Sequence, residues 1–261
     1  MFDYHMHSRV SFDGHDTGRA MAEAALAAGL KEICFTDHLD YDPLGQMGKM
    51  DFDTEAYSAE YDNLEIPGLK IRRGAEFGMD IHNVAQFQQD LQRRPFDFVL
   101  GSIHFVDDLD VYFEPYWKDK TVFQAERRYL EATLESVKLH NDFDVLAHLT
   151  YIGKTKCHPA PRPLPYAEHR EIVDEILNVL VQKGKGMEVN TSGMDRCGGY
   201  LPTADIIRRF RELGGEIVTI GSDAHTCDRV GQYAFQVCDI LKDIFGYVCT
   251  FEGRKPIFHK L

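Results

Sequence analysis

Two histidines near the amino terminus, His5 and His7, bracket a single residue in a short strand-like run. Side chains alternate between the two faces of an extended chain, so both imidazoles should point the same way and could chelate one metal ion. The pair alone is equally consistent with two partly exposed histidines at a strand end. The metal interpretation gains weight because further histidines and carboxylates recur wherever a predicted strand ends.

The candidate ligands are concentrated at the ends of the predicted strands. In chain order the predicted strand ends carry His5, His7, His38, Glu76, His104, His148, Asp223 and His225, and His15 lies in the first loop. Imidazoles and carboxylates without thiolates suit zinc, manganese or iron held for catalysis. Nine candidate ligands are too many for one ion. The sequence therefore predicts at least two ions, with ligands enough for a third, and Glu76 as the bridging carboxylate.

The elements that must position these residues alternate between strand and helix about seven times. Strands are predicted over residues 2–8, 32–36, 69–77, 96–103, 143–147, 186–191 and 216–221, with a strand-like tail at 247–252. Helices are predicted over residues 17–28, 54–64, 82–94, 121–140, 167–182, 203–213 and 232–245. Residues 39–53, 105–120 and 151–166 are predicted loops. Such alternation predicts a parallel sheet.

The placement of the candidate ligands favours a closed barrel over a doubly wound open sheet. In a β/α barrel the carboxyl ends of the strands meet on one face, whereas an open sheet would spread them along an edge too long for one site. We therefore expect residues 1–261 to form one domain, an α/β fold with a seven-stranded barrel and a metal site at the carboxyl-terminal face of the strands.

Charge and composition argue against several kinds of partner. The formal net charge of −13 disfavours a nucleic-acid partner, because such domains carry a basic face. The chain has neither a long apolar run nor an export signal, so we expect a cytoplasmic protein without a membrane partner. The six cysteines form no C-x-x-C pair, which favours buried or incidental thiols over a zinc-thiolate cluster. The oligomeric state stays open.

Several polar residues have simpler explanations than metal binding. His15 lies outside a strand, so by pattern alone it could equally be a surface residue. Loop carboxylates are usually just solvated, which is our expectation for Asp37, Asp107 and Asp108. Structural roles are favoured for the histidines in helices, proline-rich loop and tail, which are His82, His140, His158, His169 and His259.

The order and spacing of the candidate ligands resemble the polymerase-and-histidinol-phosphatase (PHP) family over essentially the whole chain. The motifs are His5-x-His7, Asp13-Gly14-His15, Thr36-Asp37-His38, Gly74-Ala75-Glu76, Gly101-Ser102-Ile103-His104, His148 and Ser222-Asp223-Ala224-His225. Within the family, the stretch from Glu188 to Gly193, followed by Arg196, is most similar to the monofunctional histidinol-phosphate phosphatases.

The resemblance implies a distorted, TIM-like seven-stranded barrel with a trinuclear centre of zinc, iron or manganese. It implies one ion on His5, His7, Glu76 and Asp223, a second on Glu76, His104 and His148, and a third on His15, His38 and His225. No ligand position of the family pattern is missing, which argues against a non-catalytic copy. Glu76, Asp223 and His225 are the ligands that we also expect to act in catalysis.

The implied reaction is hydrolysis of a small phosphate monoester, L-histidinol phosphate, by in-line attack of a metal-bridging hydroxide. Arginines would help to bind and neutralise the phosphoryl oxygens. Arg196 is the first choice because it follows the sixth strand, and Arg162 and Arg229 are weaker candidates from neighbouring loops. Any of the three could instead form a surface ion pair, and the acid that protonates the leaving group is not assigned.

Two other functions stay open at this point. A phosphoesterase for nucleotides, cyclic phosphates or oligonucleotide ends would share the same ligands. The aromatic insert at residues 111–117 could pack against an imidazole or a base, or only within its own loop. A non-enzymatic accessory domain, like that attached to bacterial replicative polymerases, is disfavoured by the acidity of the chain. Either predicted loop, 39–53 or 105–120, could cover the site.

Overall fold

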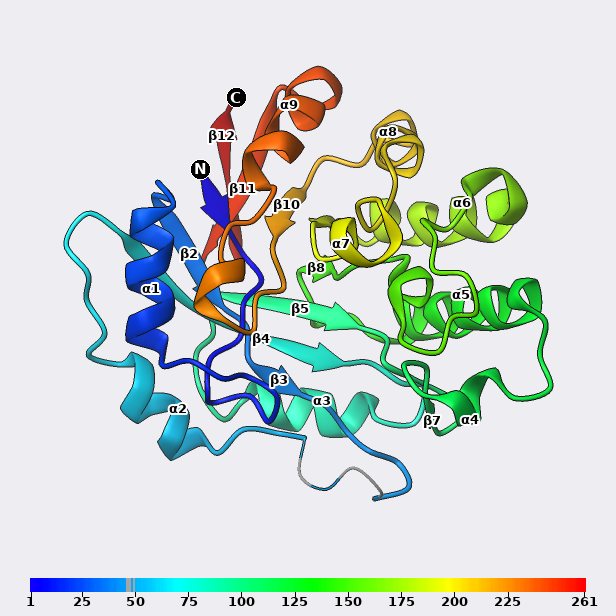
Figure 1. Cartoon of the computed structure of the whole chain (residues 1–261), viewed down its shortest axis with the longest axis horizontal. Helices are drawn as coiled ribbons and strands as arrows, with labels where there is room; N and C mark the ends of the chain where they lie inside the picture. The colour runs from blue at the N-terminus through cyan, green and yellow to red at the C-terminus, as the bar shows by residue number, and fades with distance from the viewer. Residues whose placement is uncertain (46–47, 49) are drawn as a thin grey trace.

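The computed structural model describes residues 1–45, 48 and 50–261, and its central feature is a parallel sheet surrounded by helices (Figure 1). Along the sheet the strands follow the order β1-β2-β4-β5-β8-β9-β10. Their bounds are β1 Phe2–Asp3, β2 Glu32–Phe35, β4 Lys70–Gly78, β5 Phe98–Ser102, β8 Val145–Leu146, β9 Gly186–Asn190 and β10 Val218–Gly221. The two-residue strand β3, His38–Leu39, pairs with the carboxyl-terminal part of β4.

Backbone hydrogen bonds close the sheet between its first and last strands. The amide of Tyr4 donates to the carbonyl oxygen of Ile220 at 2.8 Å, and the amide of His7 donates to that of Ala224 at 2.8 Å. The amide of Asp223 donates in the other direction, to the carbonyl oxygen of His5 at 2.7 Å. The predicted seven-stranded β/α barrel is therefore confirmed. It is irregular because β1 and β8 contribute only two residues each.

The main helices follow the predicted order with small shifts at their ends. They are α1 Gly18–Ala27, α2 Thr54–Tyr61, α3 Val84–Leu91, α5 Val122–Leu139, α6 Tyr166–Gln182, α8 Ala204–Glu212 and α9 Ala234–Ile244. Side-chain caps explain several starts. Thr17 accepts the amide of Ala20 before α1, and Thr121 forms a capping box with Gln124 before α5. Gly29, with φ of 81°, ends the turn after α1 in a left-handed conformation that suits glycine.

Short elements interrupt the segments that the sequence predicts as loops. The segment 105–120 contains a hairpin of β6, Phe105–Val106, and β7, Leu109–Asp110, followed by helix α4, Glu114–Trp117. The 3-10 helices η1, Tyr151–Lys154, and η2, Cys227–Arg229, and the helix α7, Met194–Cys197, are equally brief. Elements of two to four residues are too short to show a hydrophobic period, so sequence periodicity does not detect them. Residues 46, 47 and 49 of the predicted loop 39–53 lie outside the described residues.

A carboxyl-terminal hairpin covers the amino-terminal end of the barrel. It consists of β11, Tyr247–Glu252, and β12, Lys255–Lys260. The ring of Phe251 packs on Phe98 with centroids 4.7 Å apart, and the amide of Phe251 donates to the hydroxyl of Tyr4 at 3.0 Å. The sequence predicts β11 as a strand-like tail but misses β12. Both chain ends lie on this side, near β1 and β12 (Figure 1).

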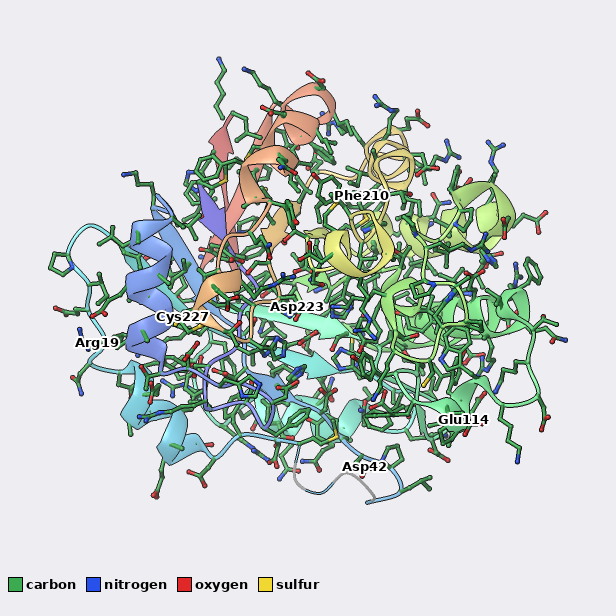
Figure 2. The ribbon with its side chains drawn as sticks, in the orientation of Figure 1. Arg19, Asp42, Glu114, Phe210, Asp223 and Cys227 are labelled. Atoms are coloured by element: carbon green, nitrogen blue, oxygen red, sulfur yellow. The ribbon has the colours of Figure 1, made fainter. Side chains whose placement is uncertain are left out.

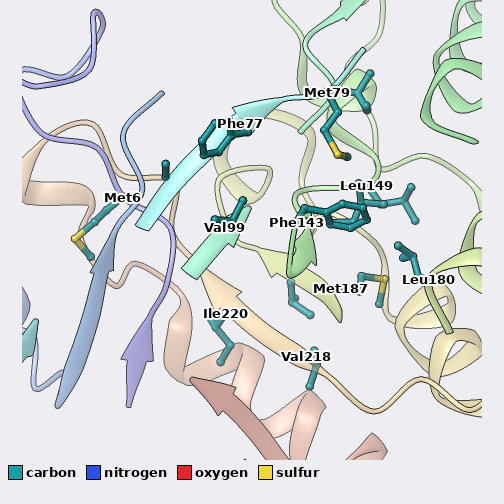
Figure 3. Close-up of a cluster of buried hydrophobic side chains, with 14 of the residues drawn as sticks. Met6, Phe77, Met79, Val99, Phe143, Leu149, Leu180, Met187, Val218 and Ile220 are labelled. Atoms are coloured by element: carbon teal, nitrogen blue, oxygen red, sulfur yellow. The ribbon is translucent and has the colours of Figure 1, made fainter. Parts of the chain in front are cut away.

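Two buried clusters form the core. The larger one lies between the strands and the surrounding helices, and Figure 3 shows part of it, including Phe77 on β4, Val99 on β5 and Leu180 on α6. The smaller cluster fills the barrel interior with Tyr4, Cys34, Phe98, Leu100, Val145, Ala147 and Phe251. Because apolar side chains fill the amino-terminal half of the barrel, the polar groups gather at the opposite end. No described helix has the length and apolar character needed to span a membrane.

Candidate metal centre

The strand ends bring eight of the nine predicted ligands together at the carboxyl-terminal end of the barrel: His5, His7, His38, Glu76, His104, His148, Asp223 and His225. The Nε2 atoms of His5 and His7 are 3.1 Å apart, as expected for two imidazoles that face one point. Glu76 Oε2 lies 3.1 Å from His5 Nε2 and 3.4 Å from His7 Nε2. Asp223, labelled near the centre of Figure 2, places Oδ1 3.5 Å from His5 Nε2.

Backbone conformation directs several of these side chains. Met6, between the two first histidines, turns into the outer core, which leaves His5 and His7 on the same side. Asp223 has a φ of 55°, a left-handed conformation that costs a non-glycine residue on the order of 1 kcal/mol. The hydrogen bond from its amide to the His5 carbonyl holds it there. Strain at this position therefore serves to aim the carboxylate at the cluster.

Two buried carboxylates orient the imidazoles from behind. Glu188 on β9 accepts hydrogen bonds from His5 Nδ1 at 2.7 Å and from the amide of His148 at 2.7 Å. Asp40 accepts a hydrogen bond from His104 Nδ1 at 3.0 Å. It also lies 2.9 Å from His38 Nδ1 without a well-formed hydrogen bond, in a group with His38 and His104 that could hold a metal ion. Such partners fix the ring orientation of metal-binding histidines. Asp40 was missed by our sequence reasoning, although its spacing of two residues from His38 repeats the His5-x-His7 signal.

The structure does not bring the His15 side chain into the cluster. His15 is exposed, and only its backbone amide approaches, donating to the carbonyl oxygen of His225 at 3.1 Å. Asp13 lies there instead, with Oδ2 3.1 Å from His225 Nε2 and 3.7 Å from His38 Nε2. Gly14 packs so closely on Ser8 that an added Cβ would lie 1.8 Å from the Ser8 carbonyl oxygen. This tight turn leaves Asp13 facing inward.

Of the three loop aspartates that we expect to be solvated, one is buried. Asp37 accepts hydrogen bonds from the amide of Ser8 at 2.9 Å and from the hydroxyl of Tyr61 at 2.5 Å. Burial raises its pKa to about 6. Asp37 thus holds the loop after His7 rather than facing solvent, and the expectation for it is wrong. Asp107 pairs with a surface arginine and Asp108 is exposed, as expected.

The carboxylates of the cluster attract positive charge. Burial disfavours the charged form of His5, yet Glu188, Glu76 and Asp223 raise its pKa well above the ordinary value. Burial also opposes the charging of His38, but Glu76 and Asp13 raise its pKa to about 9. Burial, with His225 and His38 nearby, lowers the pKa of His7 to about 3. Buried carboxylates at this density need cations beside them.

The donor atoms fit divalent metal ions. Glu76 Oε2 is buried and makes no hydrogen bond, although three imidazoles, from His5, His7 and His38, approach within 3.1 to 3.4 Å. His38 Nδ1 likewise makes no well-formed hydrogen bond. Ions among these atoms would satisfy them together, and imidazole and carboxylate donors suit zinc, manganese or iron. Among the described residues, no cysteine belongs to a group that could hold a metal ion.

A pocket of about 420 Å³ opens above the cluster, within the range of roughly 300–1,000 Å³ typical of small-molecule sites. Both candidate loops line it, through Met50 from segment 39–53 and through Tyr112 and Phe113 from segment 105–120. The aromatic residues of the insert at 111–117 have two different roles. Tyr112 and Phe113 face the pocket, whereas the buried Tyr116 donates its hydroxyl to a backbone carbonyl and packs the loop.

One of the three predicted phosphate-binding arginines lines the pocket. The Arg196 guanidinium lies 5.5 Å from the ring centroid of Tyr112, and no carboxylate of the described residues pairs with it. Arg162 instead pairs with Glu126 at 3.1 Å and with Glu168 at 2.9 Å, outside the pocket. Arg229 pairs with Asp195, also outside the pocket. The placement of Arg162 and Arg229 at the site is therefore wrong, because acidic side chains hold both elsewhere.

Lys154 is a pocket cation that the sequence reasoning missed. Its Nζ atom lies 2.6 Å from Asp223 Oδ2 and 2.6 Å from Ser192 Oγ, and only 12% of the side chain is exposed. The 3-10 helix η1 positions it six residues after His148. Its position shortly after a ligand at a strand end was the available signal. Lys154 and Arg196 therefore place two cationic groups in the pocket above the candidate metal centre.

Comparisons with known proteins relate this geometry to one family. The family model described as the PHP domain matches residues 3–192. A histidinol-phosphatase of Lactococcus lactis is 33% identical over 260 residues, covering 97% of this chain and 95% of that protein. A probable histidinol-phosphatase of Clostridium acetobutylicum is 32% identical over 238 residues, covering 88% and 89%. The crystal structure of the Lactococcus lactis histidinol phosphate phosphatase, complexed with zinc, L-histidinol and phosphate, superimposes with a TM-score of 0.82, 31% identity and 98% coverage of both chains.

Proposed function

The chain belongs to the PHP-domain family, and from this premise we propose that it is a metal-dependent phosphatase that hydrolyses L-histidinol phosphate to L-histidinol and phosphate. The observation that carries the proposal is a buried imidazole–carboxylate cluster beneath a small pocket that presents Lys154 and Arg196. The zinc, L-histidinol and phosphate in the Lactococcus lactis relative support the same substrate.

We propose three divalent ions, zinc, iron or manganese, in this cluster. His5, His7, Glu76 and Asp223 would hold the first, and Glu76 would bridge to a second held with His104 and His148. His38 and His225 would hold the third, with Asp13 in the place first given to His15. Bound ions of this kind supply a water molecule of lowered pKa as the nucleophile and offset the charge on the phosphoryl oxygens.

The protein's own cations would bind and orient the phosphoryl group. Lys154 and Arg196 line the pocket and can donate charge-assisted hydrogen bonds to phosphate oxygens. Asp223 and Ser192 hold the Lys154 ammonium in place before substrate arrives, which lowers the cost of orienting it. Glu188 and Asp40 keep the imidazoles of His5 and His104 turned toward the cluster.

The substrate is a small, water-soluble metabolite of histidine biosynthesis, and we propose that the enzyme acts in the cytoplasm. Residues from His5 to His225 contribute to one cluster, so we treat 1–261 as a single functional domain. Nucleotides, cyclic phosphates and oligonucleotide ends are not favoured as substrates. The similar proteins carry the name histidinol-phosphatase, and the pocket has the size of a site for a small molecule.

Phosphate release from L-histidinol phosphate tests the proposal when compared with nucleotides and sugar phosphates, with metal content measured on the same sample. We expect kcat/KM for L-histidinol phosphate to exceed that for every other monoester by about 100-fold, which corresponds to about 2.7 kcal/mol. A metal-loaded sample that cleaves another monoester better would show that the substrate is wrong.

A further inference from the structure

One acidic side chain faces the substrate pocket without any part in the metal centre. Asp110, the last residue of β7, lines the pocket together with Tyr112 and Phe113. No lysine, arginine or histidine of the described residues pairs with its carboxylate. The pocket is thus lined by two cationic side chains, Lys154 and Arg196, and by the carboxylate of Asp110, which forms no ion pair with a described residue.

Local structure holds Asp110 beside the metal centre. Asp110 pairs with Phe105 across the β6–β7 hairpin, and Phe105 directly follows the proposed ligand His104. The next amide, of Val111, donates to the carbonyl oxygen of His104 at 3.0 Å, which ties the hairpin to the end of β5. The carboxylate itself is oriented because Oδ1 accepts the amide of Tyr112 at 2.8 Å. Asp110 is therefore a fixed group and not a mobile surface carboxylate.

The Asp110 carboxylate is partly buried and keeps one oxygen for a ligand. Burial raises the pKa of this carboxyl, although the Tyr112 amide and His104 act in the opposite direction. The Tyr112 amide donates to Oδ1, and no other described residue donates a hydrogen bond to the carboxylate. A cationic group of a bound ligand would form a charge-assisted hydrogen bond with the free oxygen.

We propose that Asp110 binds the ammonium group of the substrate and makes the enzyme selective for phosphate monoesters of amino alcohols. The inference rests on the proposed function, since L-histidinol phosphate carries a primary amine on the carbon next to its phosphorylated methylene. That amine is protonated at neutral pH, whereas an imidazole with an ordinary pKa near 6.5 is mostly neutral. Asp110 would then bind the ammonium group, and Lys154 and Arg196 would bind the phosphoryl group, of one small molecule.

A purely structural role for Asp110 is the competing explanation, because its side chain also closes the turn onto the Tyr112 amide. The variant Asp110→Asn separates the two roles. An asparagine amide oxygen can still accept the Tyr112 amide, but it carries no charge for an ammonium. Asp108→Asn is the matched control, since Asp108 is an exposed carboxylate on the same hairpin and does not line the pocket.

The test compares two substrates on the metal-loaded enzyme: L-histidinol phosphate and 3-(imidazol-4-yl)propyl phosphate, which lacks only the amine. We expect Asp110→Asn to lower kcat/KM for L-histidinol phosphate by about 10- to 100-fold, the loss expected for one charge-assisted hydrogen bond. This loss should arise mainly from a higher KM. For the deaminated substrate, kcat/KM should change less than about threefold. Asp108→Asn should resemble the unmodified protein with both substrates.

Two results with the Asp110→Asn variant, and a third with the unmodified enzyme, would overturn the inference. Equal losses on both substrates would assign Asp110 a structural role, and the absence of any loss would remove it from recognition. If the variant misfolds, the unmodified enzyme alone decides the question. A kcat/KM for L-histidinol phosphate less than about threefold above that for the deaminated substrate would exclude an ammonium site. Failure of the proposed function looks different, because the unmodified enzyme would then not prefer L-histidinol phosphate over other monoesters.

Discussion

Asp13 and His15 lie two residues apart, yet the structure turns only one of them toward the metal centre. The motif Asp13-Gly14-His15 offers two metal-binding side chains, and spacing along the chain does not choose between them. The close contact of Gly14 with the Ser8 carbonyl sets the direction of the turn. Which of the two side chains faces the cluster thus depends on the packing of a glycine.

Metal content distinguishes these two residues. We expect Asp13→Asn to lose about one ion per chain, because an amide is a weaker metal ligand than a carboxylate, and His15→Asn to keep the full complement. Elemental analysis of both variants, purified and loaded identically, gives the answer. Retention of all ions in Asp13→Asn together with loss in His15→Asn would restore His15 as the ligand.

Lys154 is the second residue whose role can be isolated. Replacing it by glutamine removes a charged contact to the phosphoryl group, so we expect kcat/KM to fall by about 100-fold, or about 2.7 kcal/mol. The control is Lys156→Gln, an exposed lysine in the same loop, for which kcat/KM should stay within about twofold. Steady-state kinetics with L-histidinol phosphate measures both, and equal effects would contradict a specific role for Lys154.

Between elements, a buried ionic cluster joins α5, α6 and the proline-rich loop that follows η1. Glu126 on α5 accepts a hydrogen bond from His169 on α6 at 3.1 Å, and Arg162 of the loop lies 3.1 Å from the same carboxylate. His158 approaches its other oxygen at 3.4 Å. The preceding 3-10 helix η1 places Tyr151 and Lys154 in the pocket, so this cluster anchors the far end of a segment that reaches the site.

Removing the Glu126 charge should destabilise the protein. Burial tends to raise the pKa of Glu126, but the hydrogen bonds from His158 and His169 lower it to about 2. A pKa below the ordinary carboxyl value means that the stabilisation is present above about pH 4.5 and is lost as the pH falls toward 2. Glu126→Gln should cost about 3–5 kcal/mol at pH 7, because Arg162 and the buried imidazoles lose their partner.

Urea unfolding of the chelator-treated protein between pH 7 and pH 3 measures this effect free of metal release. The difference between the unmodified protein and Glu126→Gln should shrink toward acid pH. Glu168→Gln is the control, since this carboxylate pairs with Arg162 at an exposed position and should cost less than about 1 kcal/mol. A difference that does not change with pH would argue against Glu126 as the titrating group.

At the scale of the whole molecule, we expect metal binding and folding to be coupled. The proposed ligands span residues 5 to 225, and His5 and Asp223 belong to the two strand ends where the barrel closes. Ions that bind only this closed arrangement stabilise it by mass action, by about 4 kcal/mol at a free concentration 1,000 times Kd. Ions held by these residues would therefore stabilise the closed barrel.

Chelation should accordingly lower the melting temperature. For a chain of this size about 1 kcal/mol corresponds to roughly 2–4 °C, so we expect a fall of about 10 °C that zinc or manganese restores. Thermal unfolding followed by circular dichroism measures the shift. His82→Gln, at an exposed histidine away from the cluster, should show the same shift, whereas an unchanged melting temperature after complete metal removal would contradict the coupling.

The sequence by itself determined the barrel and the convergence of eight of the nine predicted ligands, because both follow from short-range patterns. Strand and helix patterns alternate along the chain, and His104, His148 and Asp223 each lie two residues beyond the last residue of a strand. Parallel strands in a barrel carry such positions to one face, so the ligand types and their convergence follow from local pattern.

Tertiary structure alone decided the features that depend on residues far apart in sequence. Arg162 pairs with Glu126 and Arg229 pairs with Asp195, and both arginines therefore lie outside the pocket. No local sequence pattern predicts these ion pairs. Lys154 gains its role only through Asp223, 69 residues away. An ion pair or a hydrogen bond depends on distance in space, and chain spacing sets that distance only within one element. Which charges face the pocket was therefore settled by how the loops pack.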